Sequence, residues 1–349
     1  MKILYLGNDS TYSTSYHRAS ALSRLGYEVE LINPYSLFKD ELRHFLMGKV
    51  HYRTGYFLLQ EKIQNWINTK IIFFKNIDLI WIDSGELFGP KCLKTLKSMH
   101  KPIILYNVDD PTGKRDGNRF KSLKKALPLY DLVVIVREET KQECLKLGAK
   151  KVLLVSRSYD EIAHLPFENT LEIPLKFKSD VAFIGTWMRN EKRDEFILKL
   201  IEHGINVSIW GDRWEKSKYW NKLKQNFKGK SLGGRDYVAA IQGAKICLGM
   251  LSKGNRDQVT TRTFEIPYIG GFFCAERTYE HLKIYEDGVE AVFWDNAEEC
   301  ATICKQILLD NNLRNNIRIG GMKKVREIQV GNEHICKKIM ALYELSVGN

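Results

Sequence analysis

The sequence predicts an α/β protein of two domains, each built on a parallel sheet with helices on both faces. Short apolar runs of strand length alternate along the chain with longer segments of helical apolar spacing. Two such series flank an irregular stretch, residues 156–179, that contains Pro166 and Pro174. A length of 349 residues also exceeds what one core ordinarily organises. We expect an N-terminal domain over residues 1–165, a C-terminal domain over 166–330, and a last helix over 331–349 that packs back toward the N-terminal domain.

The first series opens with a βαβ unit whose first strand ends at Gly7. Gly7 has no companions at G-x-G-x-x-G spacing, which disfavours a dinucleotide-binding oxidoreductase. The aromatic and basic segment 35–75 is expected to be helical, although its faces cannot be assigned. Strands are expected over residues 2–6, 28–32, 78–82, 103–106, 132–136 and 152–155, and helices over 18–25, 90–99, 118–126 and 138–147.

The second series has the same alternation, and Gly185 and Gly211 stand at the ends of two of its strands. Ordinary strand termination is one explanation for these glycines, but with Gly7 they make three at strand exits, which suits a ligand cleft. Strands are expected over residues 181–184, 207–210, 245–250, 272–274 and 291–294, and helices over 192–203, 236–242, 261–269, 297–309, 313–328 and 333–345.

Composition points to a soluble protein of a reducing compartment. No apolar run approaches the ~20 residues of a membrane span, and the first residues lack the apolar region of a signal peptide. We therefore expect a cytoplasmic location. The seven cysteines are scattered; Cys300 and Cys304 share a helix but have no second pair, so a zinc site is not expected. A net charge of +12 leaves anionic substrates, membrane surfaces and nucleic acid open as partners.

The most polar stretch lies at residues 256–267, where carboxylates, guanidinium groups and hydroxyls precede an apolar segment. Polar groups so dense beside a core need partners or a ligand. If residues 261–269 form a helix, its start offers Thr260, Thr261 and free backbone N–H groups to a phosphate. We interpret this stretch as the nucleotide end of a transferase site.

Four segments carry a family resemblance: DVAFIGTWMRNEKRDEFI, VSIWGDRW, TTRTFEIPYIGGFFCAE and EAVFWDNAEEC. They resemble the CgeB-like (spore-maturation-protein-like) glycosyltransferases, GT-B enzymes related to glycosyltransferase family 4. The resemblance is strongest over residues 180–326 and weaker in KPIILYNVDDP and YDLVVIVREE. It implies two Rossmann-like domains facing each other across a cleft, with the nucleotide-sugar on the C-terminal domain. It also implies metal-independent transfer, more often with retention than inversion.

The resemblance assigns roles to residues of the second half. Family members carry two acidic residues separated by seven others; Glu265 matches the one that holds the ribose, and Asp257 the one near the donor sugar. Asp at position 257, where the family has Glu, is a departure from the pattern. The candidates for neutralising the diphosphate are Arg262 and Lys192, with either Arg189 or Arg193.

The acceptor is expected on the N-terminal domain. At the exit of its first strand lie Gly7, Tyr12, Ser13, His17 and Arg18. An inverting reaction needs a base, for which Asp109, Asp110 and His17 are the candidates. A retaining reaction needs none, because the leaving phosphate can take the proton. Asp109 and Asp110 are adjacent and form no Asp-x-Asp triad, so a metal is not expected.

Ordinary structural roles compete with each of these assignments. Glu265 can pair with Arg262 on one helix face, Asp257 can be a solvated loop residue, and His17 a satisfied or surface histidine. Asp109-Asp110 before a proline can form a turn.

The function predicted is sugar transfer from a nucleotide-diphosphate sugar, with UDP favoured, to a glycan, lipid-linked or protein acceptor. The alternatives are a non-catalytic sugar-nucleotide-binding protein and a basic nucleic-acid-binding protein; no nucleic-acid motif supports the last. Residues 214–230 (WEKSKYWNKLKQNFKGK) are basic and aromatic, which is usual for a solvated helix face. The alternative is peripheral docking on the inner face of an anionic membrane through Trp214, Tyr219, Trp220 and Phe227.

Overall fold

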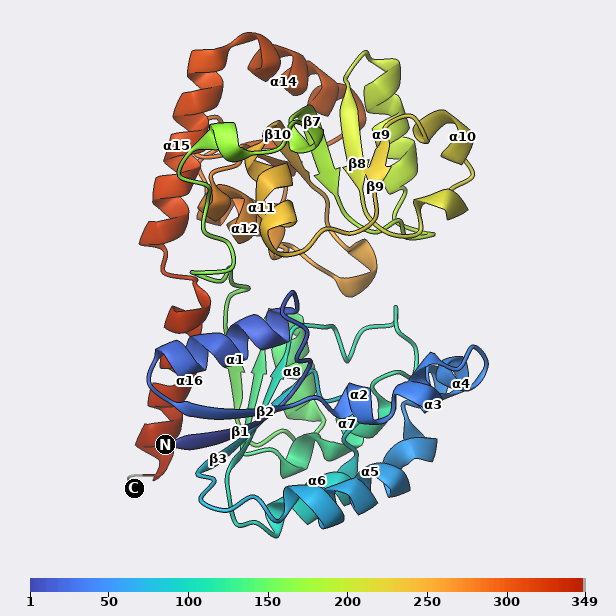
Figure 1. Cartoon of the computed structure of the whole chain (residues 1–349), viewed down its shortest axis with the longest axis vertical. Helices are drawn as coiled ribbons and strands as arrows, with labels where there is room; N and C mark the ends of the chain where they lie inside the picture. The colour runs from blue at the N-terminus through green and yellow to red at the C-terminus, as the bar shows by residue number, and fades with distance from the viewer. Residues whose placement is uncertain (348–349) are drawn as a thin grey trace. The chain divides into compact units, whose positions relative to one another are not determined.

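The structure is a computed structural model that describes residues 1–347. It divides into two compact units, one made of residues 1–156 together with the chain from 332 onward, the other of residues 157–331 (Figure 1). Each unit contains a six-stranded sheet whose neighbouring strands all pair in parallel. The predicted fold class is therefore confirmed.

The boundary between the units lies at residue 156 and not at residue 165, where it was expected. The reason is that the segment after residue 156 bonds to the second unit. Arg157 forms an ion pair with Asp257 at 2.8 Å, and the ring of Tyr159 stacks on that of Tyr268 at 3.9 Å between centroids. These contacts fix a segment that looks like a linker in sequence.

The sheet of the first unit has the strand order β2-β1-β3-β4-β5-β6. Alternate residues of β1 enter different cores, as the period of two requires: Leu4 and Leu6 face one, Ile3 and Tyr5 the other. The strands are β1 (Lys2–Leu6), β2 (Glu28–Ile32), β3 (Leu79–Asp83), β4 (Ile103–Asn107), β5 (Leu132–Ile135) and β6 (Val152–Leu154).

Helices cover both faces of this sheet. Helices α1 and α16 pack on the face that Tyr5 enters, and the segment between β2 and β3 packs on the other with α6, α7 and α8. The helices are α1 (Thr14–Arg24), α2 (Pro34–Leu37), α3 (Lys39–Arg43), α4 (Met47–Thr54), α5 (Gln60–Trp66), α6 (Pro90–Lys97), α7 (Lys121–Ala126), α8 (Glu138–Lys146) and α16 (Asn332–Val347), with short helices η1 (Phe57–Leu59), η2 (Ile67–Ile71) and η3 (Leu127–Leu129).

The sheet of the second unit has the order β12-β11-β10-β7-β8-β9. Its strands are β7 (Ser179–Ile184), β8 (Val207–Trp210), β9 (Phe227–Gly229), β10 (Ala244–Gly249), β11 (Phe273–Glu276) and β12 (Val292–Trp294). Two cores lie on its two faces. The helices are α9 (Arg193–Glu202), α10 (Trp220–Leu223), α11 (Gly234–Gln242), α12 (Arg262–Ile269), α13 (Tyr279–Ile284), α14 (Ala297–Leu309) and α15 (Asn311–Glu327), with η4 (Thr170–Glu172), η5 (Leu175–Phe177), η6 (Trp214–Lys216) and η7 (Lys253–Asn255).

The aromatic residues of segment 214–230 face inward, contrary to the membrane-docking expectation. Trp214 is fully buried, and its indole N–H donates to the carbonyl of Gly185 at 2.8 Å. Trp220 packs edge-on against Phe227, and with Tyr219 they cover the core of α9 and β8. Phe227 belongs to edge strand β9, which pairs with β8 and so brings this ring against Trp220. The lysine-rich sequence of the segment gave no sign of this strand.

Candidate functional site

The second unit has a topological switch point between β7 and β10, which are neighbours in the sheet although β8 and β9 lie between them in sequence. In parallel α/β sheets ligands bind outside the carboxyl ends of the strands at such a point. The loops after β7 and β10 both leave there. Arg193 joins them, because its Nη1 donates to the carbonyl of Thr186 and its Nη2 to that of Leu251, both at 2.9 Å.

Helix α12 follows the loop after β10, as predicted, and begins at the expected place with Thr261 as its N-cap residue. The Thr261 side chain caps no backbone N–H of the helix. Pro267 has no N–H to donate to the carbonyl of Thr263, and the hydroxyl of Tyr285 donates to that carbonyl at 2.8 Å instead. Gly270 ends the helix in the left-handed region, with φ +88°.

Glu265, in the first turns of α12, is only 6% exposed. One carboxylate oxygen accepts the hydroxyl of Tyr237 at 2.5 Å, and the other lies 3.8 Å from Nε2 of His164. Burial, with the Glu265 charge, raises the pKa of Tyr237 well above its usual value, so its hydroxyl stays a donor. The ion pair between Glu265 and Arg262, given above as the alternative role of Glu265, does not form among residues 1–347. Within the part of the chain that the structure describes, the buried Nε of Arg262 has no hydrogen-bond partner.

Asp257 lies between η7 and α12 and is 8% exposed, not a solvated loop residue. Its Oδ1 accepts from Nη2 of Arg157 at 2.8 Å, and the side chains of Arg157 and Asp257 are only 10% and 6% exposed. A buried pair of this kind holds its members in a fixed geometry. Thr260 lies between Asp257 and α12, and its backbone N–H donates to the hydroxyl of Thr263.

The four residues predicted to supply positive charge to the phosphates differ in how far their side chains are exposed to solvent. Arg189 and Lys192 are exposed in the loop after β7. Lys192 is also the N-cap residue of α9, with φ +52°. Arg193 braces the two loops through its terminal nitrogens, so its geometry favours a supporting role. Arg262 is half-buried in the first turn of α12.

Gly185 and Gly211 lie at the exits of β7 and β8, as predicted. Gly211 has φ +150°, and a Cβ there would lie 2.0 Å from the carbonyl oxygen of Gly185. That oxygen accepts the indole N–H of Trp214. Close packing of the two strand exits therefore requires glycine at position 211.

In the first unit, Arg18 was expected at the surface of the acceptor-side loop, but it is buried. It is 2% exposed, its Nε lies 3.0 Å from Oδ2 of Asp83, and its guanidinium lies 3.8 Å from the ring centroid of Tyr106. Burial lowers the pKa of Arg18, but the charge of Asp83 and smaller contributions from its other neighbours together raise it above its usual value. Arg18 reaches the core because it lies on the inward face of α1, in the second turn of this helix.

The other predicted residues of this loop have mixed positions. Tyr12 is 67% exposed. Ser13 caps α1 by accepting the N–H of Tyr16 at 3.0 Å. His17 is buried, and its Nε2 lies 3.0 Å from the carbonyl oxygen of Thr11. At Gly7 a Cβ would lie 2.3 Å from the hydroxyl of Ser15, so the loop turns tightly over α1.

Asp109 and Asp110 follow β4 and differ in environment. Oδ2 of Asp109 lies 3.3 Å from Nη1 of Arg119, and burial raises the pKa of Asp109 despite that cation. Asp110 is 2% exposed, and its Oδ1 accepts the N–H of Gly113 at 3.0 Å. This hydrogen bond closes a turn, which is the structural role given above as the alternative for Asp110.

Sequence analysis missed several residues that surround these positions. Arg157 and His164 lie in the stretch taken for a linker, and only the burial of Glu265 and Asp257 shows why they matter. Tyr237 on α11 has an ordinary helical context in sequence. In the first unit, Arg119 also pairs with buried Glu86 at 2.9 Å.

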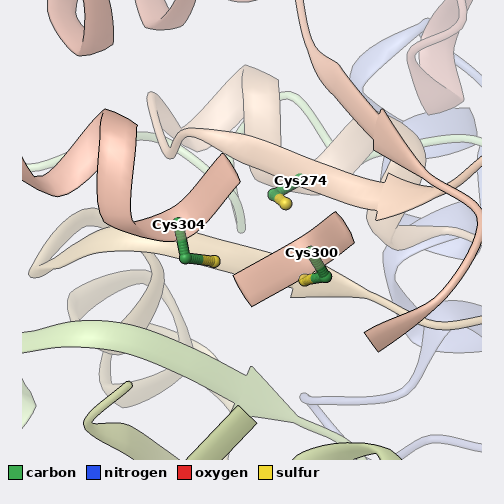
Figure 2. A group of neighbouring side chains, drawn as sticks. All are labelled: Cys274, Cys300 and Cys304. Carbon is green, nitrogen blue, oxygen red and sulfur yellow. The ribbon is translucent and has the colours of Figure 1, made fainter. Parts of the chain in front are cut away.

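Three buried cysteines form the one group of at least three His, Cys, Asp or Glu side chains with metal-ligand spacing within residues 1–347. Cys274 on β11 lies beside Cys300 and Cys304 on α14, with the ligand atoms within 4.8 Å of one another (Figure 2). A structural zinc site takes four ligands, and this group offers three. Hydrogen bonding to the other two thiols raises the pKa of Cys274 well above its usual value. Thiols in apolar surroundings fit core packing.

Two parallel six-stranded α/β units in one chain constitute the GT-B architecture, and solved structures match it throughout. Sucrose-phosphate synthase from Thermosynechococcus elongatus matches with a TM-score of 0.68 at 12% identity, covering 100% of this chain and 99% of that chain. HepE from Anabaena in complex with UDP matches with a TM-score of 0.66 at 14% identity, covering 99% and 100%. A putative UDP-N-acetylglucosamine 2-epimerase from Listeria monocytogenes matches with a TM-score of 0.61 at 10% identity, covering 99% and 96%. At these identities the likeness shows the fold.

A family comparison adds information on the second half. Residues 189–342 match the model of a family described as glycosyl transferase-like. The matched region includes α12 with Glu265, the loop with Asp257, and Lys192. No curated protein matches the chain.

Proposed function

We propose that the protein is a glycosyltransferase of the CgeB-like kind. It would move a sugar from a nucleotide-diphosphate sugar to a glycan, lipid-linked or protein acceptor. The observation that carries the proposal is Glu265: a buried carboxylate, held by Tyr237 at the start of α12, inside the region similar to glycosyl transferase-like proteins. UDP is the favoured nucleotide, because the structurally similar HepE was solved with UDP and with UDP-glucose.

In this proposal Glu265 accepts the ribose hydroxyls, and the start of α12 receives the diphosphate. The hydroxyls of Thr260 and Thr261 are the donors there, because the N–H groups of Thr263, Phe264 and Glu265 already donate to the carbonyls of Thr260 and Thr261. Arg262, with Lys192 and Arg189, supplies positive charge, while Arg193 keeps the two loops together. Cleavage of the sugar–phosphate bond builds charge on the diphosphate, and removing one donor aimed at such charge costs about 2.7–4 kcal/mol of barrier.

The first unit would bind the acceptor. For an inverting reaction, Asp109 is the best base of the three candidates, because Asp110 holds a turn and His17 contacts a backbone carbonyl. Family resemblance favours a retaining reaction, in which the leaving phosphate takes the acceptor proton. Arginine and lysine charge replaces a metal ion in this scheme, so we propose metal-independent transfer.

Nucleotide binding provides the first test. In thermal-shift titrations with UDP, GDP, ADP and CDP, UDP should raise the melting temperature of the wild type most, since a ligand stabilises the state it binds. Glu265→Gln should weaken UDP binding at least about tenfold, the loss of one hydrogen bond to a charged group. Glu215→Gln, an exposed position of the same unit, is the matched control. Wild-type affinity in Glu265→Gln would contradict the assignment.

A sugar-nucleotide-binding protein without catalysis is the second candidate. It is favoured by Asp257, which is shorter than the Glu of the family and is engaged by Arg157. Incubation with a panel of UDP-sugars separates the two: release of UDP, by transfer or hydrolysis, supports the enzyme. Binding without turnover across the panel supports the second candidate. Nucleic-acid binding is less favoured, and gel shifts at low salt test it.

We further propose a cytoplasmic location with peripheral membrane contact. Within residues 1–347, no helix has both the length and the apolar character needed to cross a bilayer.

A further inference from the structure

The helical segment between β2 and β3 presents an apolar surface to solvent. Phe45 is 73% exposed, Leu46 63%, Phe57 70% and Leu58 54%. Exposed apolar residues on a soluble protein are ordinarily scattered singly, whereas these are crowded into fourteen residues of chain around α4. We name this the α4 surface and define it by Phe45, Leu46, Met47, Val50, Phe57 and Leu58.

The α4 surface combines the outer face of α4 with residues that come directly before and after this helix. His51 turns inward and is 3% exposed, while Met47 and Val50, three residues apart, share the outer face. Gly55, with φ +65°, ends the helix and directs the chain into η1, which carries Phe57. Figure 1 shows α3 and α4 at the side of the first unit away from α1 and α16.

Positive charge accompanies the apolar residues. Residues 42–60 contain Arg43, Lys49 and Arg53, all exposed, and no Asp or Glu. The ammonium of Lys49 lies 3.7 Å from the ring centroid of Phe45. The charge of Lys49 is therefore held against the face of an exposed aromatic ring, so that basic and apolar groups share one surface.

We propose that the α4 surface docks the protein on an anionic phospholipid bilayer. Phe45, Leu46 and Phe57 enter the boundary between headgroups and acyl chains, and the basic residues meet lipid phosphates. The absence of acidic residues from 42–60 is what selects this occupant, since a protein partner of mixed charge needs no such exclusion. The inference goes beyond sugar transfer and does not depend on it.

The test is co-sedimentation of the full chain with vesicles, in the absence of donor and acceptor. Vesicles of phosphatidylcholine with 30% phosphatidylglycerol, a composition of about physiological charge, are compared with pure phosphatidylcholine. We expect binding to the anionic vesicles that falls about fivefold for each basic residue removed, so about 25-fold for Lys49→Gln with Arg53→Gln. Leu46→Ser with Phe57→Ser should weaken binding at least about tenfold.

The matched control is Lys222→Gln with Lys224→Gln, two exposed lysines of segment 214–230, which should bind like the wild type. Loss of binding in this control alone would overturn the proposal, as would a wild type that does not sediment with anionic vesicles. A third overturning result is a wild-type dimer in sedimentation velocity that Leu46→Ser with Phe57→Ser converts to a monomer, with no vesicle binding. The surface would then be covered by a second copy.

Discussion

Acid should loosen α12, because a histidine that stays neutral in the folded protein anchors its first turn. Nδ1 of His281 lies 2.7 Å from the carbonyl oxygen of Glu276, and Nε2 lies 2.9 Å from the hydroxyl of Thr263. A neutral ring with its proton on Nδ1 donates to the carbonyl and accepts from the hydroxyl. Burial lowers the pKa of His281 from 6.5 to about 4.

The sign and size of the effect follow from linkage. Between pH 6.5 and 4 the unfolded chain binds a proton at this histidine and the folded protein does not, so stability falls as the pH falls. The full difference of 2.5 pH units corresponds to about 3.4 kcal/mol, at 1.36 kcal/mol per unit. Between pH 7 and 4.5 the loss is about 2.5 kcal/mol of unfolding free energy.

Urea unfolding at pH 7 and 4.5, followed by tryptophan fluorescence, measures this loss, since five of the seven tryptophans lie in residues 157–331. His281→Gln should lower stability at pH 7 by about 1–2 kcal/mol, for the hydrogen bonding it loses. It should also decline less than the wild type on acidification, by about 2.5 kcal/mol. His203→Gln, at an exposed position of the same unit, should keep the wild-type slope. Equal slopes in wild type and His281→Gln would refute the reasoning.

Three further predictions concern other buried groups. Tyr285→Phe should lower the unfolding free energy by about 1 kcal/mol in urea unfolding, and adding Pro267→Ala should recover part of this by restoring an N–H donor in α12; no recovery would contradict the account. Arg157→Gln should cost about 3–5 kcal/mol in the same assay, because the buried Asp257 carboxylate loses its ion pair with the Arg157 guanidinium, and Asp257→Asn in that background should recover stability. Asp109→Asn should gain more stability at pH 7 than at pH 4, since burial raises the pKa of this carboxyl and disfavours its charged form. A thermal melt at the two pH values would argue against this if it showed a larger gain at pH 4.

The sheet and most helices could be predicted, because buried parallel strands read as short apolar runs between turns. The run at residues 103–106, for example, is β4 in the structure. Edge strand β9 was missed because its three residues lie in a lysine-rich segment and are only partly buried. The short α13 was missed for a related reason: six residues show too little periodicity.

The site was partly predictable. Thr260, Thr261, Arg262 and Glu265 stand together in sequence, so a local motif could locate them on one helix start. Partners from distant segments have no such signal. His164 lies 101 positions before Glu265 in the chain and is brought near it only by the fold. Arg18 was assigned to the surface of a polar loop but is buried in the structure. Nothing in its local sequence indicates that this arginine enters the core, because its partner Asp83 lies 65 residues further along the chain.

The polypeptide passes between its two units twice, after residue 156 and before residue 332. Tyr159 and Gly331 form a β-bridge, so the second unit starts and finishes at one spot. It is therefore an insertion into a Rossmann-like host, which resumes with α16 and packs Ile335 and Ile339 over α1. Deleting α16 would uncover one face of the host sheet, whereas residues 157–331 are a contiguous piece that can be excised whole for nucleotide-binding work.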